Sequence, residues 1–300
     1  MIKKLVLTHG GCMDGTGAAV AAYMEFGDSA EYIGLHHGAD FAEVIQQAAG
    51  REVYMFDFTM KRQQLEELHA VAASLVVIDH HASAKDDLAD LDYATFDMTK
   101  SGAVLAWEYF FPFTDMPAVL AYIGDRDIWA WKLPNSKAIN AHLRDVINPK
   151  STLVEAMALL LDMVKMDEEE FIKTAVEKGG ALLRQRDELM EECVKNAFLV
   201  EFNLLGETIR IPACFAPGSI ASEAGNNLAY RDGYEAGVIL LNLAYGKFGL
   251  SFRGREGTDL AKRLAVSLGG GGHACAAGCG VRPEAFGALM ATATAIPDPE

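Results

Sequence analysis

Residues 1–130 alternate short apolar stretches with longer amphipathic or alanine-rich ones, joined by only a few residues. A short apolar stretch predicts a buried strand, whereas apolar residues three or four positions apart predict a helix. Strands that alternate with helices build parallel sheets covered on both faces, so this half of the chain predicts an α/β domain. The expected strands are 4–8, 31–35, 52–56 and 75–78, and the expected helices are 15–26, 40–49, 61–72, 101–111 and 116–122.

After Pro134 the pattern becomes helical, and further along it changes again to a mixture of short strands and helices. The helical part ends in a long, charged, amphipathic stretch, which suits a helix that joins two domains. We therefore expect an α/β domain over 1–150, a helical connector over 151–196 and a smaller α+β domain over 197–300. The expected helices here are 136–146, 151–164, 168–196, 219–230 and 258–267, and the expected strands are 198–204, 207–211, 236–243 and 248–252.

Titratable residues stand where the predicted strands of the first domain end, and after a further apolar stretch near residue 122. Because the carboxyl ends of parallel strands meet at one edge of a sheet, we expect these groups to lie together. Carboxylates mixed with imidazoles suit Mn²⁺ or a similar divalent cation, so the sequence predicts a metal site at this edge. The residues are His9, Cys12, Asp14, Asp57, Asp79, His80, His81, Asp125 and Asp127.

Taken singly, most of these residues also have a structural explanation. His9 could be a surface or capping residue, Asp57 could cap a helix, and the glycines around Asp14 could form a tight turn. Asp79-His80-His81 is harder to explain in this way, because an apolar strand seldom ends in three adjacent titratable groups. Several such strand ends in one sheet favour the metal site.

The segment Asp79-His80-His81, which follows an apolar Val-Val-Ile stretch, resembles the signature of the DHH phosphoesterase superfamily. The segment 9–15 and the single Asp57 resemble the first two motifs of that family, and Asp125 or Asp127 resembles the fourth. The resemblance implies two divalent metal ions, with Mn²⁺ as the first choice and Mg²⁺ or Co²⁺ as alternatives. The catalytic residues that it implies are Asp57, Asp79, His80 and His81, and the metal ligands are His9, Cys12, Asp14, Asp57, His80 and Asp125.

The resemblance also implies a role for each group. Asp57 would bridge the two metals, and Asp79 would orient His80 through its ring N–H. His81 would point towards the substrate phosphate or support the cluster. At the fourth motif the family's acid-to-aromatic spacing favours Asp125 over Asp127, which would then pair with a neighbouring cation.

Cys12 departs from the family pattern, which usually has an aspartate at this place. A variant subgroup with Cys-x-Asp-Gly is similar. Cysteine carries less charge at neutral pH unless a metal binds it. Cys12 could therefore ligate one metal as a thiolate, lie beside the metals without ligating, or weaken one of the two sites.

A second motif lies far downstream, where the glycine run before His273 and the later Ala-Ala-Gly resemble the GGGH…AAG motif of the DHHA1 domain. It implies a DHH catalytic domain followed by a DHHA1 substrate-binding domain, with the substrate held between them. The glycine run could instead cap a helix, Arg253 could be solvated and Ser101 could be an N-cap. The substrate-binding residues that the resemblance implies are Gly270, Gly271, Gly272, His273, Arg253 and Ser101.

Two tryptophans, Trp129 and Trp131, flank Ala130 after the fourth motif. They could stack on a nucleobase, but packing in the core is the favoured interpretation.

Composition narrows the classes of partner. The net charge of −16 disfavours long duplex nucleic acid, which requires a basic surface, and allows small phosphorylated substrates. No stretch reaches the ~18 apolar residues of a membrane-spanning helix. The five scattered cysteines include no Cys-x-x-Cys pair, which argues against a zinc site or a disulfide framework. We expect a cytoplasmic protein with no membrane partner. The sequence does not decide whether the protein forms a homodimer.

Together with the resemblance, these features predict a metal-dependent phosphohydrolase that acts through two-metal activation of water. The expected substrates are short oligonucleotides, as for an oligoribonuclease, linear dinucleotides or 3′-phosphorylated nucleotides such as pAp. The alternatives are a RecJ-like single-strand exonuclease and a non-catalytic nucleotide-binding protein in which Cys12 has disabled the metal pair. An inorganic pyrophosphatase is disfavoured by the glycine run.

Overall fold

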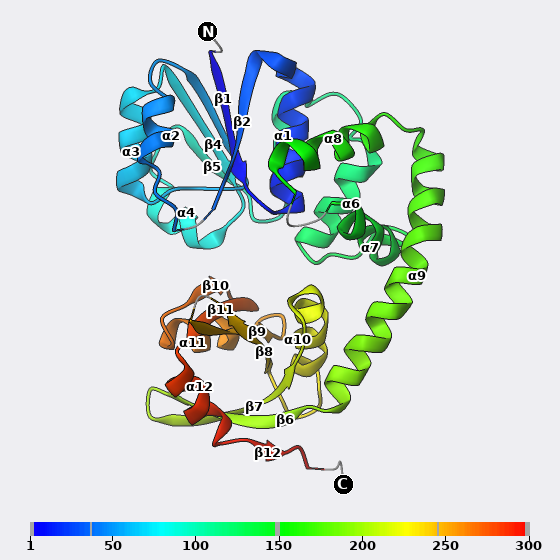
Figure 1. Cartoon of the computed structure of the whole chain (residues 1–300). Coiled ribbons are helices and arrows are strands. Elements are labelled where there is room, and N and C mark those ends of the chain that lie inside the picture. The colour runs from blue at the N-terminus through cyan, green and yellow to red at the C-terminus, as the bar shows by residue number, and fades with distance from the viewer. Residues whose placement is uncertain (1–2, 37, 148–150, 245, 298–300) are drawn as a thin grey trace. The chain divides into compact units, whose positions relative to one another are not determined.

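The computed structural model describes residues 3–36, 38–147, 151–244 and 246–297. The chain divides into two compact units, 1–183 and 184–300, and the division falls inside the longest helix, α9 (Glu168–Lys195) (Figure 1). One unit contains a five-stranded parallel sheet and the other a seven-stranded mixed sheet, which confirms the predicted α/β fold with its long helix. None of the described helices combines the length and apolar character needed to cross a membrane.

The first unit is built on a sheet of order β2-β1-β3-β4-β5, in which every neighbouring pair is parallel. Parallel neighbours require crossover connections, which the helices supply. The strands are β1 (Lys4–His9), β2 (Ala30–Leu35), β3 (Glu52–Phe56), β4 (Ser74–Asp79) and β5 (Ala94–Phe96), and the helices are α1 (Met13–Phe26), α2 (Ala42–Gln47), α3 (Arg62–Val71), α4 (Ala82–Leu88), α5 (Gly102–Phe110), α6 (Ala118–Asp127), α7 (Ser136–Val146) and α8 (Leu153–Val164).

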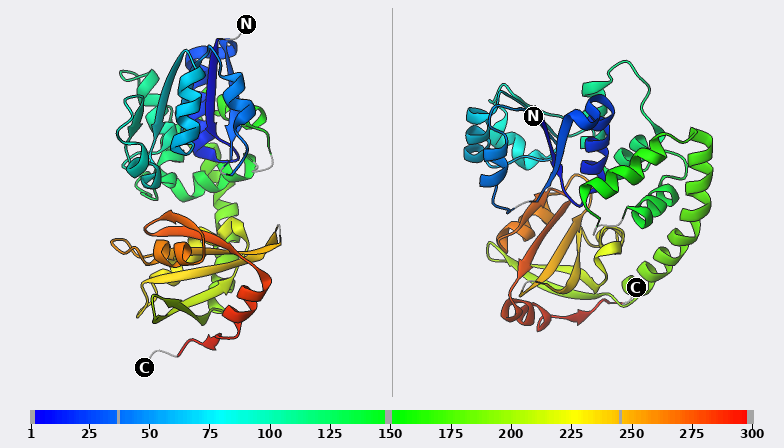
Figure 2. Two further views of the ribbon diagram at one scale, coloured as in Figure 1. Left: turned by 90° about the vertical axis from the view of Figure 1, so that its left-hand side faces the viewer. Right: turned by 45° about the horizontal axis from the view of Figure 1, so that its top comes forward.

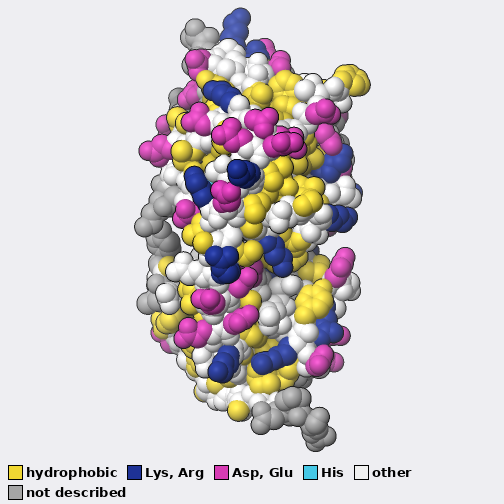
Figure 3. Space-filling model, turned by 90° about the vertical axis from the view of Figure 1, so that its right-hand side faces the viewer, with side chains coloured by type: hydrophobic (Ala, Val, Ile, Leu, Met, Phe, Trp, Pro, Cys, Tyr) yellow, Lys and Arg dark blue, Asp and Glu magenta, His cyan; other side chains and the backbone are white. Residues whose placement is uncertain are grey.

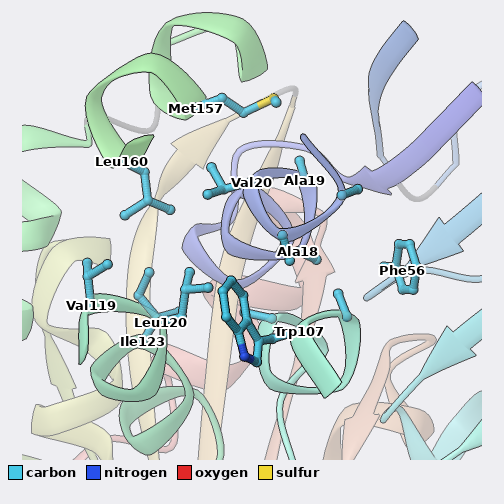
Figure 4. Packing of buried hydrophobic residues seen from close by; sticks show 14 of the residues in the cluster. Ala18, Ala19, Val20, Phe56, Trp107, Val119, Leu120, Ile123, Met157 and Leu160 are labelled. Carbon is cyan, nitrogen blue, oxygen red and sulfur yellow. The ribbon is translucent and has the colours of Figure 1, made fainter. Parts of the chain in front are cut away.

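Alternate residues of the strands serve two separate cores, one on each face of the sheet. Leu5 and Leu7 pack with α2 and α3, whereas Val6 packs with α1, α5 and α8. On the second face the alanines of α1 are fully buried and let neighbouring helices approach closely. Figure 4 shows these small side chains among the larger ones of Trp107 and Met157. This tight packing holds the start of α1 in place at the end of β1.

Most of the strands and helices expected in this unit are present, with three differences. The sequence pattern does not predict α4 and β5, which are short and carry no continuous apolar stretch. The helix expected over 116–122 is longer than predicted, because α6 continues to Asp127. The acidic residues of the fourth motif therefore lie on a helix and not after it.

The second unit holds a sheet of order β10-β11-β9-β8-β7-β6-β12, in which β7 and β8 are parallel and the other pairs antiparallel. One face packs against α10, and the other packs against α11 and α12 (Figure 2). The elements are β6 (Phe198–Leu204), β7 (Glu207–Phe215), α10 (Ala221–Ala229), β8 (Ala236–Ala244), β9 (Lys247–Gly254), α11 (Leu260–Ser267), β10 (Gly271–His273), β11 (Ala276–Val281), α12 (Pro283–Met290) and β12 (Thr294–Ala295).

The sequence pattern predicts no strand or helix after residue 267. The structure forms β10 and β11 there, and they pair as an antiparallel hairpin beside β9. Glycine and alanine dominate these strands, so neither β-propensity nor alternation marks them. The pairing with β9 decides their conformation.

Candidate metal centre

Asp14 lies at the start of α1 and is 1% exposed. Its two carboxylate oxygens accept hydrogen bonds from the backbone N–H groups of Gly102 (2.6 Å) and Ala103 (3.0 Å). These groups form the N-terminus of α5, where the helix dipole favours negative charge. A Cβ on Gly102 would lie 2.3 Å from the Cβ of Asp57, so only glycine lets α5 approach both aspartates.

Asp57 follows the last residue of β3 in a left-handed conformation, with a φ of 55°. Aspartate tolerates this conformation better than most residues, and strained backbone of this kind gathers at functional sites. The side chain is 2% exposed, and its Oδ1 lies 3.1 Å from Nε2 of His80. Its Oδ2 makes no hydrogen bond within the described part of the chain, and Nδ1 of His9 lies 3.8 Å from it. A buried carboxylate oxygen in this state requires a further positive partner.

His80 brings three carboxylates around one ring nitrogen. Its Nε2 lies 3.1 Å from Asp57, 3.5 Å from Asp127 and 3.6 Å from Asp14. Burial lowers the pKa of this imidazole, although the neighbouring acid Asp14 acts in the opposite direction. The neutral ring is the form that binds metals.

Potential ligand atoms fall into three groups, which overlap at Asp57 and His80. The atoms of His9, Cys12 and Asp57 lie within 4.8 Å of one another, and so do the atoms of Asp14, His80 and Asp127. Asp57 also groups with His80, Asp79 and His81. The structure thus brings together side chains from four places far apart in the chain, and the two groups that share no residue could each hold a cation.

The fourth-motif acid in these groups is Asp127 and not the preferred Asp125. Asp125 accepts hydrogen bonds at its carboxylate from the backbone N–H groups of Lys132 (2.7 Å) and Leu133 (3.3 Å). Residues two positions apart on a helix lie on different faces, so only one of the two acids can face His80. The preference for Asp125 rested on the family's spacing to Trp129, which takes no account of the helix. Helical periodicity extended to residue 127 would have separated the two acids.

Asp79 orients a different histidine from the one expected. Its Oδ1 accepts hydrogen bonds from the backbone N–H of His80 (2.8 Å) and from Nδ1 of His81 (2.7 Å), and not from the ring of His80. Burial by itself would lower the pKa of His81, but the bond to Asp79 and the charges of Asp79 and Asp127 raise it. His81 therefore tends to carry a positive charge beside the cluster.

The donor set fits divalent cations. Burial and the charge of Asp14 raise the pKa of Asp127 to about 8, and the same two causes raise that of Asp57 well above its usual range. Burial and the nearby Asp127 and Asp14 raise the pKa of Cys12 to about 12. Like charges gathered in one buried place repel, and a divalent cation among them would reverse these shifts. Oxygen, imidazole and one sulfur atom are suitable ligands for Mn²⁺ and related ions.

In the second unit the glycine run begins as a helix cap. Gly269 has a φ of 80°, and the N–H groups of Gly269 and Gly270 bond back to the carbonyls of Val266 and Ala265 at the end of α11. A Cβ on Gly270 would lie 2.1 Å from the carbonyl oxygen of Gly278. The capping alternative therefore accounts for the first half of the run.

The second half of the run is exposed on β10. Gly272 has a φ of 137°, and a Cβ there would lie 2.6 Å from the carbonyl oxygen of Ala276. Gly271 is different, because a Cβ on it would meet no atom within 4 Å. Gly271 and His273 are both exposed. Backbone conformation or close packing thus requires glycine at three of the four positions. At Gly271 neither of them does.

Two further predicted substrate residues have structural roles. Ser101 is fully buried and accepts a hydrogen bond from Val104 N at the start of α5, which matches the N-cap alternative. Arg253 on β9 donates to Ser251 (3.1 Å), to the carbonyl oxygen of Phe252 (2.8 Å) and to Ser222 (2.7 Å). These hydrogen-bond partners are neutral, and burial lowers the pKa of Arg253 while the charge of Glu223 acts in the opposite direction.

The prediction that the two tryptophans pack in the core is wrong for Trp129, whose side chain is 37% exposed. Trp129 and Trp131 both have positive φ angles, and their rings meet edge to face at 5.0 Å. The carbonyl oxygen of Asp125 accepts hydrogen bonds from the N–H groups of Ala130 and Trp131. Asp125 thus holds this loop with both its main chain and its side chain.

No family profile matches the chain. It is 28% identical over 293 residues to an uncharacterised protein of Acanthamoeba polyphaga mimivirus, covering 91% of this chain and 66% of that protein. The chain therefore spans just under two thirds of the length of this relative.

Solved structures share the fold. The chain is structurally similar to DHH-family phosphoesterases and has their two-domain architecture. A pGpG-specific phosphodiesterase from Vibrio cholerae is 14% identical, with a TM-score of 0.53 and 97% of each chain covered. RecJ of Thermus thermophilus in complex with Mn²⁺ is also 14% identical, with a TM-score of 0.53, 97% of this chain and 51% of that chain covered. An exopolyphosphatase-related protein from Bacteroides fragilis is 15% identical, with a TM-score of 0.54 and coverage of 97% and 91%.

Proposed function

We propose that this protein is a metal-dependent phosphohydrolase that cleaves a phosphate ester in a linear dinucleotide, a short oligonucleotide or a 3′-phosphorylated nucleotide. The observation that carries the proposal is the pair of ligand groups, His9–Cys12–Asp57 and Asp14–His80–Asp127, joined where Asp57 meets His80 at 3.1 Å. When bound, two divalent cations would make a water acidic enough to attack phosphorus and would offset charge on the phosphoryl oxygens.

The protein's own contribution is a rigid set of ligands and one cationic side chain. Asp14 is fixed by the two N–H groups of α5, and Asp57 by its left-handed backbone and by close contact with Gly102. Ligands held in this way need little rearrangement when a cation binds. His81, with its raised pKa and its bond to Asp79, would donate a charged hydrogen bond to a phosphate oxygen.

The substrate class rests on charge and on the relatives. The chain carries a net charge of −16, and the face drawn in Figure 3 intersperses acidic, basic and apolar side chains without a continuous basic band. Such a surface suits a small substrate better than a long polyanion. The Vibrio cholerae protein is named as specific for pGpG, which belongs to the proposed dinucleotide class.

The test is a substrate panel with Mn²⁺, comprising pAp, a linear dinucleotide, a short RNA and a long single-stranded DNA. We expect the short substrates to be hydrolysed and the long DNA to be a poor substrate. In Asp57→Asn the asparagine can adopt the left-handed backbone conformation, but the negative charge between the two ligand groups is lost. This variant should therefore lower kcat by about a hundredfold or more. Asp115→Asn, a change at an exposed acid, serves as the matched control.

Three outcomes would count against the proposal. Wild-type activity in Asp57→Asn would show that the two ligand groups are not the catalytic site. Preferred cleavage of long DNA would favour the RecJ-like alternative. Nucleotide binding without turnover, with Mn²⁺, Mg²⁺ and Co²⁺ each supplied, would favour the non-catalytic one.

A further inference from the structure

A cavity of about 220 Å³ shares a wall with the candidate metal centre. Cys12 lines the cavity and also belongs to the ligand group of His9 and Asp57. The other walls come from the first turn of α1, the end of α6, the end of α7 and the start of α8. All of these elements lie in the first unit, so one folded domain forms the cavity.

The cavity is lined by two arginines, Arg126 from α6 and Arg144 from α7, both of them half-buried. Within the described ranges the guanidinium of Arg126 makes no hydrogen bond or close ion pair, although its charge acts on the neighbouring Asp127. A guanidinium is always charged and presents a planar fork of N–H donors that matches phosphate. Two such groups facing one cavity, in a chain that is strongly acidic, indicate a site for an anion.

The backbone adds to the positive character of this cavity. Gly11, Cys12 and Met13 line it, and they lead into α1, a helix of 14 residues that begins at Met13. No side chain caps this helix start. The first N–H groups of a helix, together with its dipole, attract anions such as phosphate.

We propose that this cavity is a subsite for a second phosphate group of the substrate, held by Arg126, Arg144 and the start of α1. The proposal rests on the proposed function, because the scissile phosphate would lie at the metal centre next door. The cavity has room for a phosphate group, and the charge of its two arginines matches that group better than it matches a neutral nucleobase. The protein then prefers substrates that carry two phosphoryl groups, such as pAp or a 5′-phosphorylated dinucleotide.

The first experiment compares matched substrates. kcat/KM is measured with Mn²⁺ for pAp against 3′-AMP, and for a 5′-phosphorylated dinucleotide against the same dinucleotide without that phosphate. We expect the wild type to favour the doubly phosphorylated member at least tenfold, and the ratio to collapse towards one in Arg126→Gln/Arg144→Gln. In Arg62→Gln, which removes an arginine already paired with Asp90, the wild-type ratio should persist. The subsite proposal is overturned if the wild type shows no preference for the doubly phosphorylated substrate. It is also overturned if the double variant loses kcat/KM equally on both substrates of a pair.

The second experiment does not depend on turnover. Inorganic phosphate is titrated calorimetrically into protein treated with a chelator, for the wild type, Arg126→Gln/Arg144→Gln and Arg62→Gln. We expect one phosphate to bind the wild type and Arg62→Gln, and the affinity to fall at least tenfold in the double variant. Equal affinity in all three proteins, or no binding to any, overturns the proposal.

The two proposals can fail separately. If no phosphate ester is hydrolysed but phosphate binding depends on the two arginines, the anion site stands and the proposed function fails. If short substrates are hydrolysed without regard to a second phosphate, and phosphate binding ignores the arginines, the function stands and the subsite fails.

Discussion

Asp125 and Asp127 lie two positions apart at the end of α6, and their carboxylates serve different parts of the protein. That of Asp127 lies 3.5 Å from Nε2 of His80, whereas that of Asp125 accepts backbone hydrogen bonds from Lys132 at 2.7 Å and Leu133 at 3.3 Å. One acid therefore faces the candidate metal centre, and the other holds the loop that follows the helix.

The two aspartates should respond differently to the same substitution. Asp127→Asn should weaken Mn²⁺ binding by about 10–100-fold, the range seen when a group that supports a metal site is lost. Asp125→Asn should instead lower the free energy of unfolding by about 1–3 kcal/mol, because two part-buried backbone N–H groups lose a charged acceptor. Calorimetric titration with Mn²⁺ and thermal unfolding with a chelator present measure the two effects. If Asp125→Asn instead lost affinity for Mn²⁺ and kept its stability, Asp125 and not Asp127 would be the metal ligand.

The acidic cluster predicts opposite pH trends for metal binding and for stability without metal. Burial and Asp14 raise the pKa of Asp127 to about 8, so protons compete with Mn²⁺ below that pH. Mn²⁺ affinity should rise as the pH increases from 6 to about 8, by up to about tenfold per pH unit for each proton displaced.

With a chelator present the trend in stability reverses. A carboxyl whose pKa is raised on folding binds more protons in the folded than in the unfolded protein, so stability falls as the pH rises from about 4 to about 8. Tm should therefore decrease over this range, and it should decrease less in Asp127→Asn. A Tm that rises with pH in the chelated protein would contradict the raised pKa.

Cys12 should act as a thiolate ligand when a softer cation occupies the site of His9 and Asp57. Its sulfur lies within 4.8 Å of ligand atoms of both residues. A cation there would deprotonate the thiol despite the pKa of about 12 that burial and the nearby acids produce. Co²⁺ should then give a thiolate-to-cobalt charge-transfer band in the wild type that is absent in Cys12→Ser. Cys275→Ser, at a cysteine of the second unit, controls for other thiols, and a band retained in Cys12→Ser would place Cys12 outside the ligands.

The glycine run allows a matched pair of substitutions. Gly271→Ala meets no atom within 4 Å, so Tm should stay unchanged while KM for the best short substrate rises about fivefold or more. Gly270→Ala would force a Cβ to 2.1 Å from the carbonyl oxygen of Gly278, so its Tm should fall. His273→Ala should raise KM in the same way as Gly271→Ala. Unchanged kinetics in both Gly271→Ala and His273→Ala would remove β10 from the substrate site.

Much of the architecture was readable from the sequence because it depends on local patterns. Apolar stretches such as 52–56 and the helical period of 136–146 coincide with β3 and α7, since burial on a sheet or helix face imposes those periods. The segments that were missed, such as β5 and β11, have no such pattern and become strands only by pairing with a neighbour. The α/β class and the presence of a second, mixed α+β unit followed from the same periodicity.

The residue types of the candidate metal centre could also be found in the sequence, because parallel strands deliver their carboxyl ends to one edge. The residues that each of these groups contacts could not be predicted from the sequence. The choice of Asp127, the bond of Asp79 to His81 and the hold of α5 on Asp14 each depend on how distant elements pack. So does the meeting of Arg126 and Arg144 around one cavity. The sequence alone therefore determined which chemical groups are available and on which edge, whereas tertiary packing decided which of them face each other, because side-chain direction depends on contacts between segments far apart in the chain.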